Sequence, residues 1–167
     1  MKKIFAALLA LVISLPALGE GKFVQTPYKP AKVVFDFYLD DPLEMGSALY
    51  WLRSLINPLL EEPYGYSPED LNIKVVIHGT EIVTFAKKNE KKYQDVVDRM
   101  RYYAELGVEF KVCIQAAEEY GYAAKDFQDF VQLVPNSLIE LAHWQQAGYA
   151  LITPKIFVKR NAIEKIR

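Results

Sequence analysis

The chain has 167 residues, 51% of them hydrophobic, and its 20 basic and 21 acidic residues leave a net charge of −1. A chain of this length forms one domain of ordinary size and buries enough surface to fold without a disulfide or a metal. The balanced charge gives the chain as a whole no electrostatic attraction to nucleic acid or to an anionic membrane. One cysteine, Cys113, excludes an internal disulfide and any pair of cysteines for zinc or redox chemistry.

The first nineteen residues have the pattern of a secretory signal peptide. Lys2 and Lys3 precede an apolar run at 4–15, and the small residues Ala17 and Gly19 are spaced for cleavage after Gly19. The apolar run is shorter than the ~20 residues that a membrane-spanning helix needs. We therefore predict an exported protein of the periplasm, without a membrane span.

Strands and helices are expected to alternate along the mature chain, after an extended lead-in at 20–31. Apolar and β-branched runs predict five strands, at residues 32–39, 71–78, 108–114, 127–134 and 149–153. Periodic apolar residues predict helices at 42–59 (ended or kinked by Pro58), 89–107 and 136–146, a turn or short helix at 115–122, and a basic amphipathic tail at 155–167. This order is typical of an α/β domain with a mostly parallel sheet of about five strands.

The candidate site residues follow the ends of the first three strands, because sites in parallel sheets form beyond the carboxyl ends of the strands. Asp40 follows the first strand, His78 and Gly79 follow the second, and Cys113 and Gln115 end and follow the third. We predict no cofactor and no metal, since the sequence contains no phosphate-binding glycine loop and no metalloprotease motif.

Cys113 is the strongest candidate for chemistry. If a helical turn follows Cys113, the free N–H groups of that turn favour the thiolate. His78 would serve as base or charge partner if the two strands are neighbours. The alternative is a buried structural cysteine that behaves as a small hydrophobe, with His78 bonded to the backbone.

Three segments in this order resemble the DsrE/DsrF-like family, close to its small exported members. They are GVEFKVCIQAAEEYG at 107–121, VPNSLIEL at 134–141 and QAGYALITP at 146–154. The resemblance covers 32–154 and implies a three-layer α/β/α domain and a homo-oligomer, a trimer or a hexamer. In the sulfur-relay members a cysteine that corresponds to Cys113 holds a persulfide. Those members work in the cytoplasm, however, and the loop at 61–70 and the tail look like additions.

Two functions follow from these observations, and the sequence does not decide between an enzyme and a binding protein. The first is a sulfur carrier, in which Cys113 takes sulfur from a donor protein and passes it to an acceptor protein. The second is a non-catalytic oligomeric binding module with a buried Cys113. A carrier needs a sulfur atom that its partners can reach, so the exposure of Cys113 distinguishes them.

Overall fold

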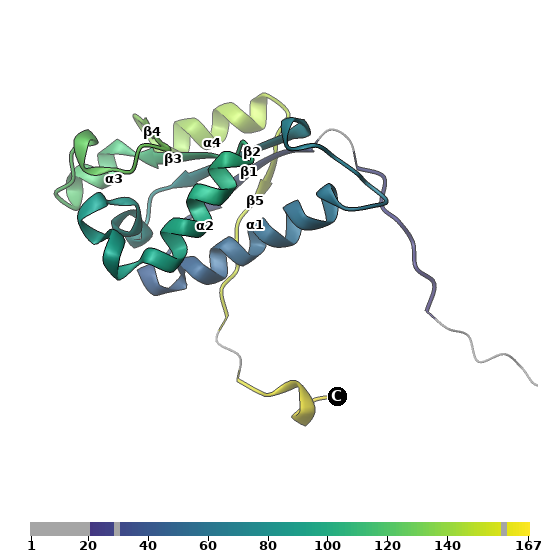
Figure 1. Cartoon of the computed structure of the whole chain (residues 1–167). Coiled ribbons are helices and arrows are strands. Elements are labelled where there is room, and N and C mark those ends of the chain that lie inside the picture. Colours follow the sequence, from purple (N-terminus) through teal and green to yellow (C-terminus); the bar gives the residue numbers. More distant parts are fainter. Residues whose placement is uncertain (1–20, 29–30, 158–159) are drawn as a thin grey trace, which may run out of the picture.

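The computed structural model describes residues 21–28, 31–157 and 160–167, and the predicted signal peptide lies outside them (Figure 1). The described chain contains a five-stranded sheet in the order β4-β3-β2-β1-β5, and all of its strand pairings are parallel. The strands are β1 (Ala31–Phe37), β2 (Leu71–Ile77), β3 (Glu109–Cys113), β4 (Val131–Val134) and β5 (Ala150–Ile152).

Helices cover both faces of this sheet. They are α1 (Met45–Leu60), α2 (Gln94–Glu105), α3 (Ile114–Glu119) and α4 (Ser137–Gln146). The connections from β1 to β4 all step the same way along the sheet, whereas the last one returns across it to β5. Because such crossovers are right-handed, α1 and α2 lie on one face and α4 on the other (Figure 1). The predicted three-layer α/β/α fold is confirmed.

The alternation of side chains along β1 explains the two layers of packing. Val33, Phe35 and Phe37 point into the larger core with α1 and α2. Val34, between them, joins a smaller cluster with Leu141 of α4. Lys32 and Asp36, on either side of Val34 on the α4 face, are only half-buried, so β1 is covered on both faces but more completely on the side of α1 and α2.

Most element boundaries differ from the sequence-based prediction by one to three residues, and three of the differences have a clear structural cause. The second long helix begins at Gln94 instead of residue 89, because 87–92 forms a 3₁₀ segment. The fourth strand begins at Val131, since Phe127 forms an isolated antiparallel bridge with Ala86. Helix α1 continues two residues beyond Pro58; a proline so near the end costs the helix only its own N–H bond.

Candidate functional site

The structure brings His78 and Cys113 to the same level of the sheet. Ile77 pairs with Val112 in the register of β2 and β3, so the next residues, His78 and Cys113, lie side by side on chains that run about 4.8 Å apart. The N–H of His78 also donates to the carbonyl of Phe37 at 3.2 Å, which continues the pairing with β1 by one residue. Both candidate side chains thus belong to the carboxyl edge of the sheet.

The His78 ring is held by two neighbours, Asp36 and Tyr38. The Nε2 of His78 lies 2.8 Å from Oδ1 of Asp36. The hydroxyl of Thr153 donates to the other oxygen of Asp36 at 3.4 Å, and the Tyr38 ring stacks on the imidazole with centroids 4.8 Å apart. Sequence reasoning did not select Asp36. Its position as the one acidic residue in a largely apolar strand was a usable signal.

Cys113 is buried in the single chain, with 3% of its surface exposed. It belongs to neither of the two hydrophobic clusters, and its sulfur takes part in no hydrogen bond among the described residues. Helix α3 begins at the next residue, Ile114. The burial of the thiol favours the alternative of a structural cysteine.

Gln115 is tied to the loop that follows β4. The Nδ2 of Asn136 donates to its Oε1 at 3.0 Å, while Oδ1 of Asn136 caps α4. Cys113 pairs with Val134 in the sheet, and the two bonded residues each lie two positions farther along their chains. The Gln115–Asn136 bond therefore joins the first turn of α3 to the loop between β4 and α4.

Glu81 organises the neighbouring loops and was missed by sequence reasoning. Its side chain is fully buried. Its Oε2 accepts from the N–H of Leu39 at 2.9 Å, and Oε1 accepts from the N–H groups of His78 and Gly79 at 3.2 and 2.9 Å. Burial raises the pKa of Glu81, although these hydrogen bonds oppose the rise. Its place in the short apolar segment TEIVTF was the only hint in the sequence.

Gly79 and Asp40 have different places at this edge. A Cβ atom on Gly79 would lie 2.4 Å from the carbonyl oxygen of Leu39 and 2.4 Å from the Glu81 carboxylate, so only glycine fits. Asp40 is exposed in the bend after β1, and Asp41, not Asp40, caps the following turn by accepting from the N–H of Leu43. Within the described ranges no three His, Cys, Asp or Glu side chains form a group suited to a metal ion.

A second polar cluster lies on the sheet face below α4. The buried Lys111 places its Nζ 3.1 Å from Glu109 and 3.5 Å from Glu140, and Lys74 pairs with Glu109 as well. Burial pushes the pKa of Glu109 upward, but the bonds from the two lysines outweigh it, so the pKa is lowered. The cluster is structural, because its charges satisfy one another.

Comparison with known proteins places this fold in a family. The DsrE/DsrF-like family matches residues 33–154. The chain belongs to the DsrE/DsrF-like family. Among solved structures it is similar to the protein of unknown function MTH1491 from Methanobacterium thermoautotrophicum, with 22% identity, 73% of this chain and 97% of that chain covered, and a TM-score of 0.58. No curated protein matches it.

Family membership connects the chain with sulfur relay only in general terms. The similarity to MTH1491 is low in sequence and supports the fold alone. In the part of the chain that the structure describes, no helix is long and apolar enough to cross a membrane.

Proposed function

We propose that this DsrE/DsrF-like protein carries sulfane sulfur on Cys113 and passes it from a donor to an acceptor in the periplasm. The proposal is supported by the Asp36–His78 bond of 2.8 Å and by the strand register that sets His78 beside Cys113. A thiol becomes a useful nucleophile when a base lies next to it and a third group orients that base.

The transfer needs no cofactor and no net oxidation. Cys113 gives its proton to His78, and the thiolate attacks the outer sulfur of a donor persulfide, R–S–SH. A new S–S bond forms on Cys113, the donor's S–S bond breaks, and the donor leaves as R–SH with the proton from His78. An acceptor thiolate then attacks the outer sulfur of the Cys113 persulfide, the S–S bond on Cys113 breaks, and Cys113 leaves as a thiolate that regains a proton from solvent.

Partners must reach a sulfur that the single chain buries. The bond between Gln115 and Asn136 is the exposed link just beyond the end of β3. We expect this link to open when a donor docks.

A second candidate function is a non-catalytic oligomeric binding module. The 3% exposure of Cys113 favours it, because an unused thiol in an exported protein is safest when it is buried. The carrier needs a Cys113 sulfur that reacts in the native protein, whereas the binding module needs one that does not react.

The deciding experiment treats the native protein with a low-molecular-weight persulfide and follows its intact mass. Because Cys113 is the only cysteine, a gain of one sulfur atom reports on this residue. We expect the gain in the wild type, none in Cys113→Ser, and slower loading in His78→Asn. A native protein that gains no sulfur and resists alkylation, while the denatured protein is alkylated, would support the binding module.

The proposed location has its own test. The amino-terminal sequence of the protein recovered from a periplasmic fraction should begin at Glu20, directly after the predicted cleavage site. An uncleaved chain recovered with the cytoplasm would contradict export.

A further inference from the structure

Helix α1 has an outer stripe that stays exposed among the described residues of the single chain. The stripe consists of exposed residues at helical spacing, namely Ser47, Tyr50, Trp51, Ser54 and Pro58. None of these is charged, and the whole 16-residue helix carries a single charged residue, Arg53. Surface helices usually present charged residues on the side away from the core, so this stripe has the composition of a face that is covered.

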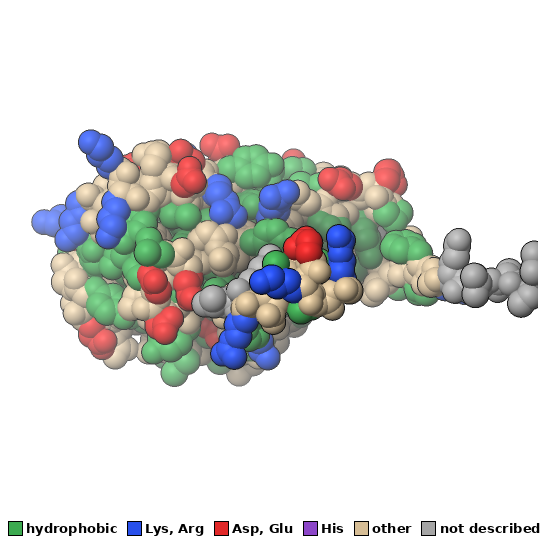
Figure 2. All heavy atoms as spheres, turned by 90° about the horizontal axis from the view of Figure 1, so that it is seen from below, with side chains coloured by type: hydrophobic (Ala, Val, Ile, Leu, Met, Phe, Trp, Pro, Cys, Tyr) green, Lys and Arg blue, Asp and Glu red, His purple; other side chains and the backbone are tan. Residues whose placement is uncertain are grey.

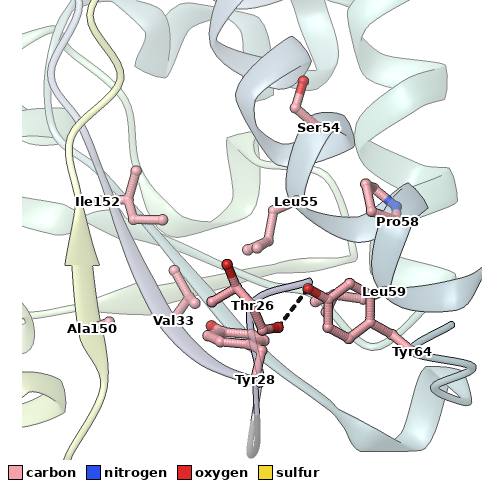
Figure 3. A pocket seen from close by; sticks show the side chains of 10 residues that line it. All are labelled: Thr26, Tyr28, Val33, Ser54, Leu55, Pro58, Leu59, Tyr64, Ala150 and Ile152. Atoms are coloured by element: carbon pink, nitrogen blue, oxygen red, sulfur yellow. Dashed lines mark hydrogen bonds between the residues drawn. The ribbon is translucent and has the colours of Figure 1, made fainter. Parts of the chain in front are cut away.

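Two hollows border the outer stripe along its length. The first, of about 630 Å³, lies between the first turns of α1, including Tyr50 and Trp51, and the chain at 155–157. The second, of about 340 Å³, lies beside Ser54 and Pro58, over the edge strand β5. Figure 3 shows its wall: Tyr64 donates a hydrogen bond to the carbonyl of Thr26 and so fastens the lead-in segment there.

The basic tail, 155–167, has the features of an occupant. It holds five basic residues and one acidic residue, whereas the preceding 154 residues hold 15 basic and 20 acidic ones. Ile156 packs against the core, but all eight residues of 160–167 are exposed, including Ile163 and Ile166. In the view from below, exposed hydrophobic side chains lie beside a group of Lys and Arg side chains (Figure 2).

An acidic loop, 61–70, stands at the far end of the outer stripe. Glu61 and Glu62 are exposed immediately after the last residue of α1, and Glu69 is exposed near the end of the same loop. The ten residues after Phe157, up to Arg167, span up to about 33 Å when extended, and the helix from Trp51 to Leu60 is only about 14 Å long. A tail that enters at the first hollow therefore reaches the acidic loop.

From these features we propose that the basic tail of one copy lies along the outer stripe of α1 of a second copy, with its basic residues against the acidic loop. Apolar residues such as Ile163 and Ile166 would cover the hollows. The exchange is reciprocal and closes as a two-fold pair. A second copy is favoured over the same chain because all of 160–167 is exposed. It is favoured over an anionic membrane because the second hollow is lined by Tyr64 of the acidic loop.

The test uses the mature protein, purified after the cell has processed its amino terminus. Its molar mass is measured by light scattering over a range of protein concentrations. We expect an oligomer whose association weakens at least tenfold in the tail-reversed variant Arg160→Glu/Lys165→Glu and in the loop-reversed variant Glu61→Lys/Glu62→Lys. The control Lys91→Glu/Lys125→Glu makes the same charge change on exposed residues outside the tail and should leave the association unchanged.

Mixing the two reversed variants decides between exchange and folding back within one chain. Only exchange lets a reversed tail meet a reversed loop on another copy, so the mixture should regain wild-type association. Four results would overturn the proposal: no restoration on mixing, an unchanged mass after deletion of 158–167, a wild type that stays monomeric, and a tail that binds anionic phospholipid vesicles instead. Circular dichroism checks that each variant is folded.

Discussion

The change Glu81→Gln tests the role of the buried carboxylate that holds the loops around His78. The two carboxylate oxygens of Glu81 accept hydrogen bonds from three backbone N–H groups, and Oε2 is the sole acceptor for the N–H of Leu39. An amide NH₂ at that position leaves the Leu39 N–H without an acceptor, and a buried donor without an acceptor costs about 1–3 kcal/mol. The opposite amide orientation leaves the Gly79 N–H without an acceptor instead, while the N–H of His78 keeps its bond to the carbonyl of Phe37.

The pH dependence of this loss has a defined sign. Because the pKa of Glu81 is raised above its ordinary value of 4.5, the folded protein holds its proton more tightly than the unfolded chain does. Glu81 therefore contributes most to stability below pH 4.5, and that contribution falls as the pH rises through the raised pKa. We expect Glu81→Gln to lower the free energy of unfolding by about 1–3 kcal/mol near pH 4.5, with a smaller difference at higher pH.

Urea unfolding of both proteins between pH 4.5 and 8 measures this difference, with Glu119→Gln as an exposed control within about 0.5 kcal/mol of wild type. A Glu81→Gln variant as stable as the control would refute the reasoning. A difference that widens with pH would also refute it, because it would mean that the protein holds Glu81 ionised.

Three further predictions concern the same domain. Gly79→Ala should abolish folding or strongly lower the melting temperature, because its Cβ would meet the backbone at 2.4 Å; a normal thermal transition would contradict this. Lys111→Met should lower the urea midpoint, most at neutral pH, because it leaves Glu109 with one fewer cation; equal midpoints would show that the pair contributes nothing. Gln115→Ala should speed the alkylation of native Cys113 several-fold, and an unchanged rate would show that the Gln115–Asn136 link does not limit access.

Much of the fold could be predicted because its signals are local. The strand at β1 is apolar apart from Lys32 and Asp36, which indicates a sheet covered on both sides, and Gly107 marks the end of α2 with a left-handed backbone. The start of α2 and the segment before β4 were placed wrongly for a different reason. Phe127 pairs with Ala86, 41 residues away, in an isolated bridge, and no local pattern reports such a contact.

The site was predictable in part. Position at strand ends selected His78 and Cys113, and the observed register sets them side by side. Asp36 and Glu81 were missed because their roles depend on contacts across the fold: His78 lies 42 residues from Asp36, and Leu39 lies 42 residues from Glu81. Whether solvent reaches Cys113 also depends on the loop after β4, which sequence alone does not position.

The most direct test of the carrier is a mass-spectrometric time course of loading and discharge on native protein. The protein is loaded with sulfur from a persulfide, separated from the donor, and mixed with a thiol acceptor. Our account predicts that the extra sulfur atom leaves Cys113 and appears on the acceptor, and that His78→Asn slows both steps. A protein that takes up no sulfur, or that keeps a persulfide the acceptor cannot remove, would contradict it.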